Sequence, residues 1–254
     1  MQTVRTVRSH QHGFTLTELA VVFTIVALLL GTLMYTLSAQ TEQRSPDETV
    51  RRLEQARELL LGFAMVNGRL PCPATLTSNA AESIAAAAGT GTGGTCSVSY
   101  NGYLPAATLG FLPTRNDGLA ADAWGNAIRY AVSKTSEPHF TANVTLKANW
   151  STTPPADIDI CKSLAAANQS SCATAANRLV TTGTAVAVIW SQGKNFAVSG
   201  AVSINEQNNN DAFAAFVSRA PSPSEATEGE FDDLVVWIPV GLLYGRMIAA
   251  GVLP

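Results

Sequence analysis

The fold of this chain follows from one N-terminal stretch, which reads Gly13-Phe14-Thr15-Leu16-Thr17-Glu18-Leu19 and continues as an apolar run to about residue 37. No Asp, Glu, Lys or Arg occurs between Leu19 and Thr41. A helix over those residues is about 35 Å long at about 1.5 Å per residue, which is enough to cross a bilayer core of about 30 Å. Glu18 is the exception, because a carboxylate just inside an apolar segment is unfavourable and therefore indicates a function.

The residues before this run form a short basic leader. Arg5 and Arg8 are its charged side chains, and residues 1–13 contain no acid. Positive charge ahead of an apolar helix places the N-terminus in the cytoplasm. A secretory signal peptide is cleaved after its apolar region, whereas here the glycine lies before it. Cleavage between Gly13 and Phe14 therefore leaves the apolar helix on the protein.

This order of features resembles the N-terminal signature of type IV pilins and of type II secretion pseudopilins: a basic leader, Gly13, Phe14, three residues, Glu18, Leu19 and an apolar helix. The resemblance implies that a prepilin peptidase cleaves after Gly13 and methylates the new amine of Phe14. It also implies an assembly role for Glu18, which neutralises the Phe14 amine of a neighbouring subunit as helices pack into a filament. A carboxylate in an apolar bundle indeed needs such a partner. The alternative is a plain signal anchor whose Glu18 lies among the lipid headgroups.

By the same resemblance, the fold is α+β, with a long N-terminal helix packed on an antiparallel β-sheet head. We expect a leader at 1–13, a transmembrane and filament-core helix at 14–40, an amphipathic stalk helix at 41–66 and a periplasmic head at 67–254. The precursor is then a single-pass inner-membrane protein with a cytoplasmic N-terminus, and the processed protein enters a periplasmic or cell-surface filament.

The stalk segment has the periodicity of a helix with one buried face. Its apolar side chains recur at helical spacing, namely Val50, Leu53, Ala56, Leu60 and Ala64. Ser45 and Glu48 match a capping box, with Pro46 at the first helical position. Either a new helix begins at Ser45 or the long helix bends there. Gly68 and Pro71 then end the helical pattern.

Composition and charge indicate a folded protein without a nucleic-acid partner. The chain of 254 residues is 46% hydrophobic and 14% charged, which is typical of a folded chain rather than a disordered one. Removing the leader lowers the number of basic residues from 16 to 14 against 19 acidic ones, so the net charge changes from −3 to −5. A nucleic-acid groove requires a concentrated basic face, so none is expected.

The four cysteines, Cys72, Cys96, Cys161 and Cys172, all follow the apolar run and so lie on the oxidising side of the membrane. Four cysteines allow three pairings. We favour Cys72–Cys96 with Cys161–Cys172, because each bridge staples a stretch too rich in small and polar residues to hold itself by packing. Zinc is the alternative, but the sequence has no Cys-x-x-Cys pair and a single histidine, His139, after the leader.

The head contains several short β-prone segments. Alternating or continuous apolar runs predict strands at about 128–133, 139–148, 185–190, 196–203 and 234–238. A short helix is expected at 240–250. The segment from Asp122 to Tyr130 is also similar to the Asp-Pro-Trp-Gly-x-Pro-Tyr-x-Tyr segment of major pseudopilins, with Trp124 and Tyr130 as expected core anchors.

Two further segments resemble the major pseudopilin, in which a Ser-x-Gly-x-Asp turn and an acidic segment enclose a structural calcium ion. The matching segments here are 191–195 and 228–237. The resemblance implies Ser191, Asp232 and Asp233 as calcium ligands, with backbone carbonyls completing the six to eight oxygens that calcium requires. Asn195 stands where an Asp is expected and Lys194 adds a cation, so a solvated acidic loop is the alternative.

The leading functional expectation is a structural one. The chain is expected to be a minor or tip subunit of a type IV pilus or a type II secretion pseudopilus, with prepilin peptidase and other pilin or pseudopilin subunits as partners. An adhesin or ligand-binding head on a pilin stalk is the alternative, with the loops at 77–95 and 205–211 as its surface. No enzyme is expected, because the sequence lacks a Gly-x-Ser-x-Gly elbow and a His-Glu-x-x-His zinc motif.

Overall fold

The structure, a computed structural model, describes residues 15–135, 138–152, 156–196 and 203–254, excepting the side chains of residues 32–43. The chain divides into two compact units, Met1–Arg44 and Ser45–Pro254. The expected leader at 1–13 and most of the expected strand at 196–203 lie outside the described residues.

Helix α1 (Leu16–Asn67) is a single helix of 52 residues with Pro46 inside it. Of the two alternatives at Ser45, the start of a new helix is therefore excluded, because the helix continues through this point. In the part of the chain that the structure describes, no helix is both long enough and apolar enough to cross a membrane. The expected membrane span at 14–40 stays a prediction.

The second unit is built on the apolar face of the later turns of α1. Four of the five side chains expected on this face are fully buried, namely Leu53, Ala56, Leu60 and Ala64, and Leu61 joins them. Val50 is 40% exposed and does not belong to the face. The amphipathic pattern of the stalk therefore predicted the packing of this helix well.

The central sheet has four strands, β3 (Gly102–Tyr103), β4 (Arg129–Val132), β6 (Ala185–Ser191) and β8 (Leu234–Pro239), in the order β3-β4-β6-β8. All neighbouring pairs are antiparallel. Every residue of β6 is buried, as expected for a continuous apolar run between two neighbouring strands. The α+β fold with an antiparallel sheet is thus present.

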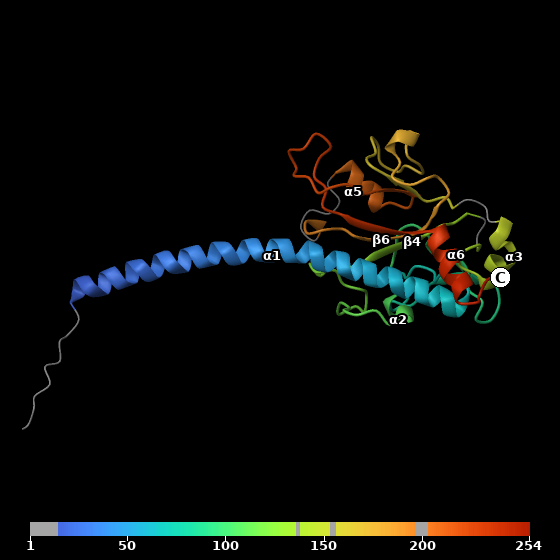
Figure 1. Cartoon of the computed structure of the whole chain (residues 1–254), viewed down its shortest axis with the longest axis horizontal. Coiled ribbons are helices and arrows are strands. Elements are labelled where there is room, and N and C mark those ends of the chain that lie inside the picture. Colours follow the sequence, from blue (N-terminus) through green and yellow to red (C-terminus); the bar gives the residue numbers. More distant parts are fainter. Residues whose placement is uncertain (1–14, 136–137, 153–155, 197–202) are drawn as a thin grey trace, which may run out of the picture. The chain divides into compact units, whose positions relative to one another are not determined.

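The two faces of the sheet belong to different cores because side chains alternate along a strand. Tyr130 and Ile189 face the core that includes the second half of α1. Ala131 and Trp190, one position along, face a second core with Phe216. Figure 1 shows the sheet between the second half of α1 and a layer that contains α5.

The second layer is assembled from segments in which the sequence pattern predicted no strand or helix. It contains β5 (Asp159–Cys161), which pairs in parallel with β7 (Ala215–Val217), and α5 (Ile204–Asn209). The short helix η2 (Ala175–Asn177) follows closely after Cys172 of the second disulfide. A small core surrounds that disulfide, with Phe231 as its largest member.

The remaining elements are short. The loop at 72–96 folds into a hairpin of β1 (Ile84–Ala87) and β2 (Gly94–Cys96). Helix α2 (Ala106–Leu109) follows β3, and helix α6 (Val240–Ala249) follows β8 where a short C-terminal helix was expected. Leu243 and Met247 of α6 are fully buried in the first core.

One expected strand is a helix. The segment at 139–148 has alternating apolar residues, but α3 (Asn143–Asn149) and the short helix η1 (Trp150–Thr152) occupy this part of the chain. Ala142 and Leu146, four residues apart, are both buried, whereas Val144 is half-exposed. Burial thus follows a helical spacing of four rather than the strand spacing of two.

Candidate functional site

The first described turn of α1 is capped by its own side chains. Glu18 Oε2 accepts hydrogen bonds from the Thr15 backbone N–H at 2.9 Å and the Thr15 hydroxyl at 2.8 Å. In return, the Glu18 N–H donates to Thr15 Oγ1 at 3.3 Å. This reciprocal pair is a capping box. Gly13 and Phe14, the expected cleavage and methylation site, lie outside the described residues.

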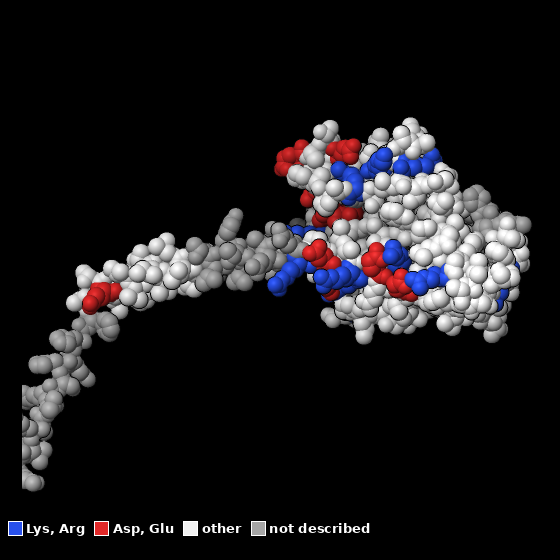
Figure 2. All heavy atoms as spheres, in the orientation of Figure 1, with Lys and Arg blue, Asp and Glu red and all other residues white. Residues whose placement is uncertain are grey.

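The first turns of α1, around and after Glu18, expose a long series of large apolar side chains. They are Leu16, Leu19, Val21, Val22, Phe23, Ile25, Val26, Leu28, Leu29 and Leu30. Glu18 is the one charged side chain between residues 15 and 31, and Figure 2 shows the rest of that stretch without charge. Contiguous exposed apolar surface of this size marks a site of protein or membrane contact.

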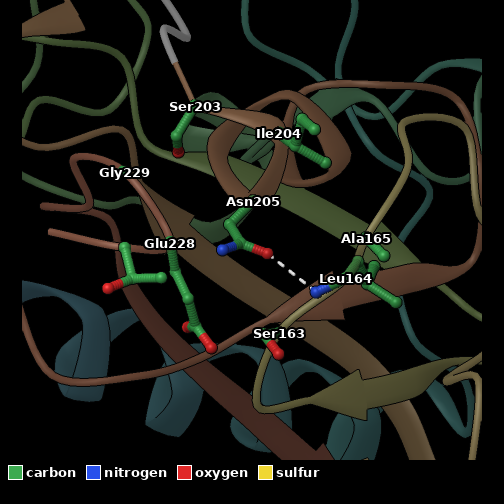
Figure 3. A pocket seen from close by; sticks show the side chains of 9 residues that line it. Ser163, Leu164, Ala165, Ser203, Ile204, Asn205, Glu228 and Gly229 are labelled. Carbon is green, nitrogen blue, oxygen red and sulfur yellow. Dashed lines mark hydrogen bonds between the residues drawn. The ribbon is translucent and has the colours of Figure 1, made fainter.

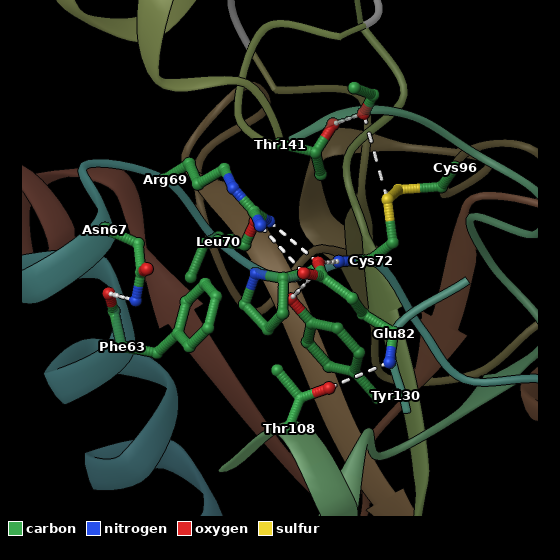
Figure 4. A network of polar contacts seen from close by, with 12 residues as sticks. Phe63, Asn67, Arg69, Leu70, Cys72, Glu82, Cys96, Thr108, Tyr130 and Thr141 are labelled. Atoms are coloured by element: carbon green, nitrogen blue, oxygen red, sulfur yellow. Dashed lines mark hydrogen bonds and ion pairs between the residues drawn. A yellow bond between two sulfur atoms is a disulfide. The ribbon is translucent and has the colours of Figure 1, made fainter. Parts of the chain in front are cut away.

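Both disulfides have the sequential pairing that the sequence favoured, Cys72–Cys96 and Cys161–Cys172. Each is accompanied by an arginine–carboxylate pair whose carboxylate also accepts from a cysteine N–H. At the first, Arg69 and Glu82 form two hydrogen bonds of 2.7 Å, and Glu82 accepts from the Cys72 N–H at 3.2 Å (Figure 4).

The second disulfide has the same arrangement. Asp159 accepts from Arg178 at 3.1 Å and from the Cys172 N–H at 3.1 Å. Each bridge therefore lies beside a charge pair with one buried partner, Arg69 at the first and Asp159 at the second, as well as being held by its covalent bond. Such a pair is tolerable in the interior because both partners are present.

The expected calcium ligands come from two segments, the end of β6 and the residues just before β8. Ser191 lies at the end of β6, and its hydroxyl donates to Asp122 Oδ2 at 2.5 Å. Asp122 Oδ1 in turn accepts from the N–H groups of Trp124 and Asn126. Ser191 thus connects β6 to the segment at 122–130, and its expected role as a calcium ligand stays a prediction.

Asp232 does meet the turn at 191–195, as the resemblance implied. Its Oδ2 accepts from the N–H groups of Lys194 at 2.8 Å and Asn195 at 3.0 Å. Gly193 has a φ of +67°, and a Cβ there would lie 2.1 Å from Asp232 Oδ1, so the turn requires glycine for both conformation and space. Within the described parts of the chain, Asp232 Oδ1 is buried without a hydrogen-bond partner.

A third carboxylate, that of Glu206, joins Asp232 and Asp233. One oxygen of each lies within 4.8 Å of the others. We call these three residues the acidic trio. Glu206 and Asp233 are buried, and Asp232 is half-buried. Burial raises the pKa of Asp233 well above its ordinary value, and the negative charges of Glu206 and Asp232 raise it further, against a hydrogen bond from the Asn209 amide.

Sequence reasoning missed Glu206, although a signal for its position was present. Ser203 and Glu206 form a capping box at the start of α5, which is the Ser-x-x-Glu pattern. That pattern predicts a helix start but not its tertiary neighbours. Asn209, at the end of α5, links this helix to Asp233 and to β7. Its amide donates to Asp233 Oδ2 at 2.8 Å and to the Val217 carbonyl at 3.0 Å.

The asparagine tract at 205–211 is largely structural. Asn205, Asn208 and Asn209 are buried, and Asn205 Oδ1 accepts from the Leu164 N–H at 2.8 Å. The expectation that this tract forms a binding surface was therefore wrong for these residues. Figure 3 shows the Asn205 bond inside a pocket of about 470 Å³, which Glu228 also lines.

Comparison with known proteins identifies the N-terminal segment. Residues 8–34 match the prokaryotic N-terminal methylation motif, which is the prepilin motif of type IV pilins and pseudopilins. The match covers the end of the leader from Arg8, the expected cleavage site, Glu18 and the first apolar turns of α1. No curated protein and no solved structure is significantly similar to the chain.

Proposed function

We propose that this protein is a minor or tip subunit of a type IV pilus or a type II secretion pseudopilus. The observation that carries the proposal is the methylation motif at residues 8–34, whose helical turns expose their apolar side chains. A folded unit at Ser45–Pro254 with its own cores fits the head of such a subunit. The proposed role is structural: the protein acts by assembling with other subunits.

The proposed pathway begins with a precursor in the inner membrane. Prepilin peptidase cuts after Gly13 and methylates Phe14, and the processed chain then enters a periplasmic or cell-surface filament. Cleavage removes Arg5 and Arg8 and keeps the apolar residues. The exposed apolar side chains then supply the surface that neighbouring subunits cover.

Glu18 is the residue that we propose aligns one subunit with the next. In the single chain its carboxylate caps the helix through Thr15 and remains exposed. A carboxylate that is buried among apolar helices is stabilised only by an opposite charge, and the new amine of a neighbouring Phe14 supplies one. The capping box holds the carboxylate at the helix terminus, which is where an incoming N-terminus meets it.

The experiment that tests processing compares the protein expressed with and without a prepilin peptidase. Intact mass and N-terminal sequencing then identify the product. The proposal expects a chain that begins at methylated Phe14 only when the peptidase is present. A chain that still begins at Met1, or one cut beyond Ala39, contradicts the proposal.

We also propose that the acidic trio holds a calcium ion, with Glu206 as a ligand beside Asp232 and Asp233. Three facts support a fit: the donors are all hard oxygens, two of the carboxylates are buried, and Asp232 Oδ1 lacks a hydrogen-bond partner within the described residues. Calcium prefers carboxylate and carbonyl oxygens. A bound cation supplies the positive charge that balances the trio. It thereby connects α5, which carries Glu206, to the residues just before β8, which include Asp232 and Asp233.

A further inference from the structure

Arg129 is a buried cation on the face of the sheet that points away from α1. It is the first residue of β4 and lies opposite Tyr103 of β3 and Trp190 of β6. Only 6% of the residue is exposed. Its guanidinium carbon lies 4.3 Å from the centroid of the Tyr103 ring and 5.9 Å from that of Trp190. The aromatic rings stabilise the cation but carry no negative charge.

The polar partners of Arg129 do not balance its charge. Nη2 donates to Oδ1 of Asn101 and, at 3.2 Å, to Oδ1 of Asn210. Both acceptors are neutral amides. Across the described ranges, Nε has no acceptor, and no carboxylate forms an ion pair with this guanidinium.

Two other arginines of this protein show how a buried or half-buried guanidinium is normally compensated. Arg69 is equally buried, at 5% exposure, and has a carboxylate partner in Glu82. Arg178 has one in Asp159. Burying a charge costs several kcal/mol unless an opposite charge compensates it. Arg129 therefore lacks the counter-charge that the buried Arg69 and the half-buried Arg178 have, and burial accordingly lowers its pKa from the ordinary value.

A cavity adjoins this unbalanced charge. It has a volume of about 110 Å³ and is lined by Arg129 together with Tyr103, Leu119, Ala127 and Gln192. The Asp117 carboxylate at the same cavity is already paired with Arg115 at 3.3 Å. The cavity thus combines one uncompensated cation with a small apolar wall, which is how a small-molecule site orients a charged ligand.

We propose that this cavity binds a small organic carboxylate. The ligand's carboxylate pairs with the Arg129 guanidinium, whose planar donors match a carboxylate. A short apolar stem fills the space against Leu119 and Ala127. A larger, more strongly hydrated oxyanion such as phosphate leaves that apolar wall uncovered. The cavity shares no lining residue with the exposed apolar series at 16–30 or with the acidic trio, so the proposal does not depend on the proposed filament function.

The test uses the full chain in detergent, with propionate as the probe and propionamide as its neutral counterpart. Thermal unfolding and calorimetric titration measure binding. Propionate is expected to raise the unfolding temperature with a Kd on the order of 1 mM, whereas propionamide has no effect. Equal responses to the two compounds, or tighter binding of phosphate, overturn the proposal.

Three variants identify the site. Arg129→Gln is expected to weaken propionate binding by about ten- to a hundredfold, the range for hydrogen bonds to a charged group. Arg246→Gln, at an exposed arginine that pairs with Glu58, is the matched control and retains full affinity. Ala127→Leu fills the cavity while keeping Arg129, and so tests the site even if Arg129→Gln fails to fold. Unchanged affinity in a folded Arg129→Gln or Ala127→Leu variant overturns the proposal.

Discussion

Replacing Glu82 by glutamine is expected to destabilise the second unit because it leaves the Arg69 charge buried alone. The two side chains are 6% and 18% exposed and share two hydrogen bonds of 2.7 Å. Removing one partner of a buried pair costs about 3–5 kcal/mol. Partial exposure of Glu82 places the expected loss near the lower end, about 3 kcal/mol. For a unit of this size, that loss lowers the unfolding temperature by about 6–12 °C.

Denaturant unfolding followed by tryptophan fluorescence measures this loss, since all four tryptophans lie in the unit Ser45–Pro254. The double variant Arg69→Met with Glu82→Leu removes both charges and leaves mainly the Cys72 N–H without its acceptor. It is expected to lose only about 1–2 kcal/mol. Glu58→Gln breaks an exposed pair with Arg246 and should cost less than about 1 kcal/mol. The reasoning is refuted if Glu82→Gln costs no more than this control, or if the double variant is less stable than the single one.

Three further predictions concern the head. Excess EGTA is expected to lower the unfolding temperature of the calcium-loaded protein but not that of Asp233→Asn, and an unchanged unfolding temperature of the unsubstituted protein removes the calcium proposal. Burial lowers the pKa of His139 below its ordinary value. The stability that the neutral imidazole contributes is therefore complete above about pH 6.5 and is lost as the pH falls below that value. An NMR titration of His139, the single histidine of the cleaved chain, contradicts this if its midpoint lies at or above about 6.5. Replacing Cys161 and Cys172 by serine is expected to cost about 3 kcal/mol for an 11-residue separation, and a change in unfolding free energy below about 0.5 kcal/mol counts against it.

The features that were predictable from sequence are those set by local pattern. The apolar runs of β6 and β8, the periodic face of the stalk and the pairing of cysteines close in sequence each depend on short stretches of chain. The methylation motif is likewise continuous in sequence. Such features need no knowledge of how distant segments meet.

The rest depends on tertiary contacts that no local pattern encodes. Glu206 reaches Asp232 and Asp233 because α5 packs beside β7, with Asn209 bonded to Val217. Ser191 was assigned to the calcium site by motif, and no local pattern indicated that its hydroxyl donates to the distant Asp122. In the same way, nothing in the sequence around Arg129 says that its neighbours across the sheet are neutral.

The central claim is that Glu18 directs assembly, and filament incorporation of two variants tests it most directly. Glu18→Ala removes both the carboxylate and its half of the capping box, whereas Thr15→Ala weakens the same cap and keeps the carboxylate. The measurement is the fraction of cleaved subunit recovered in sheared filaments. Glu18→Ala should be cleaved and membrane-bound yet nearly absent from filaments, while Thr15→Ala is incorporated normally. Equal incorporation of Glu18→Ala and the unsubstituted protein contradicts the account.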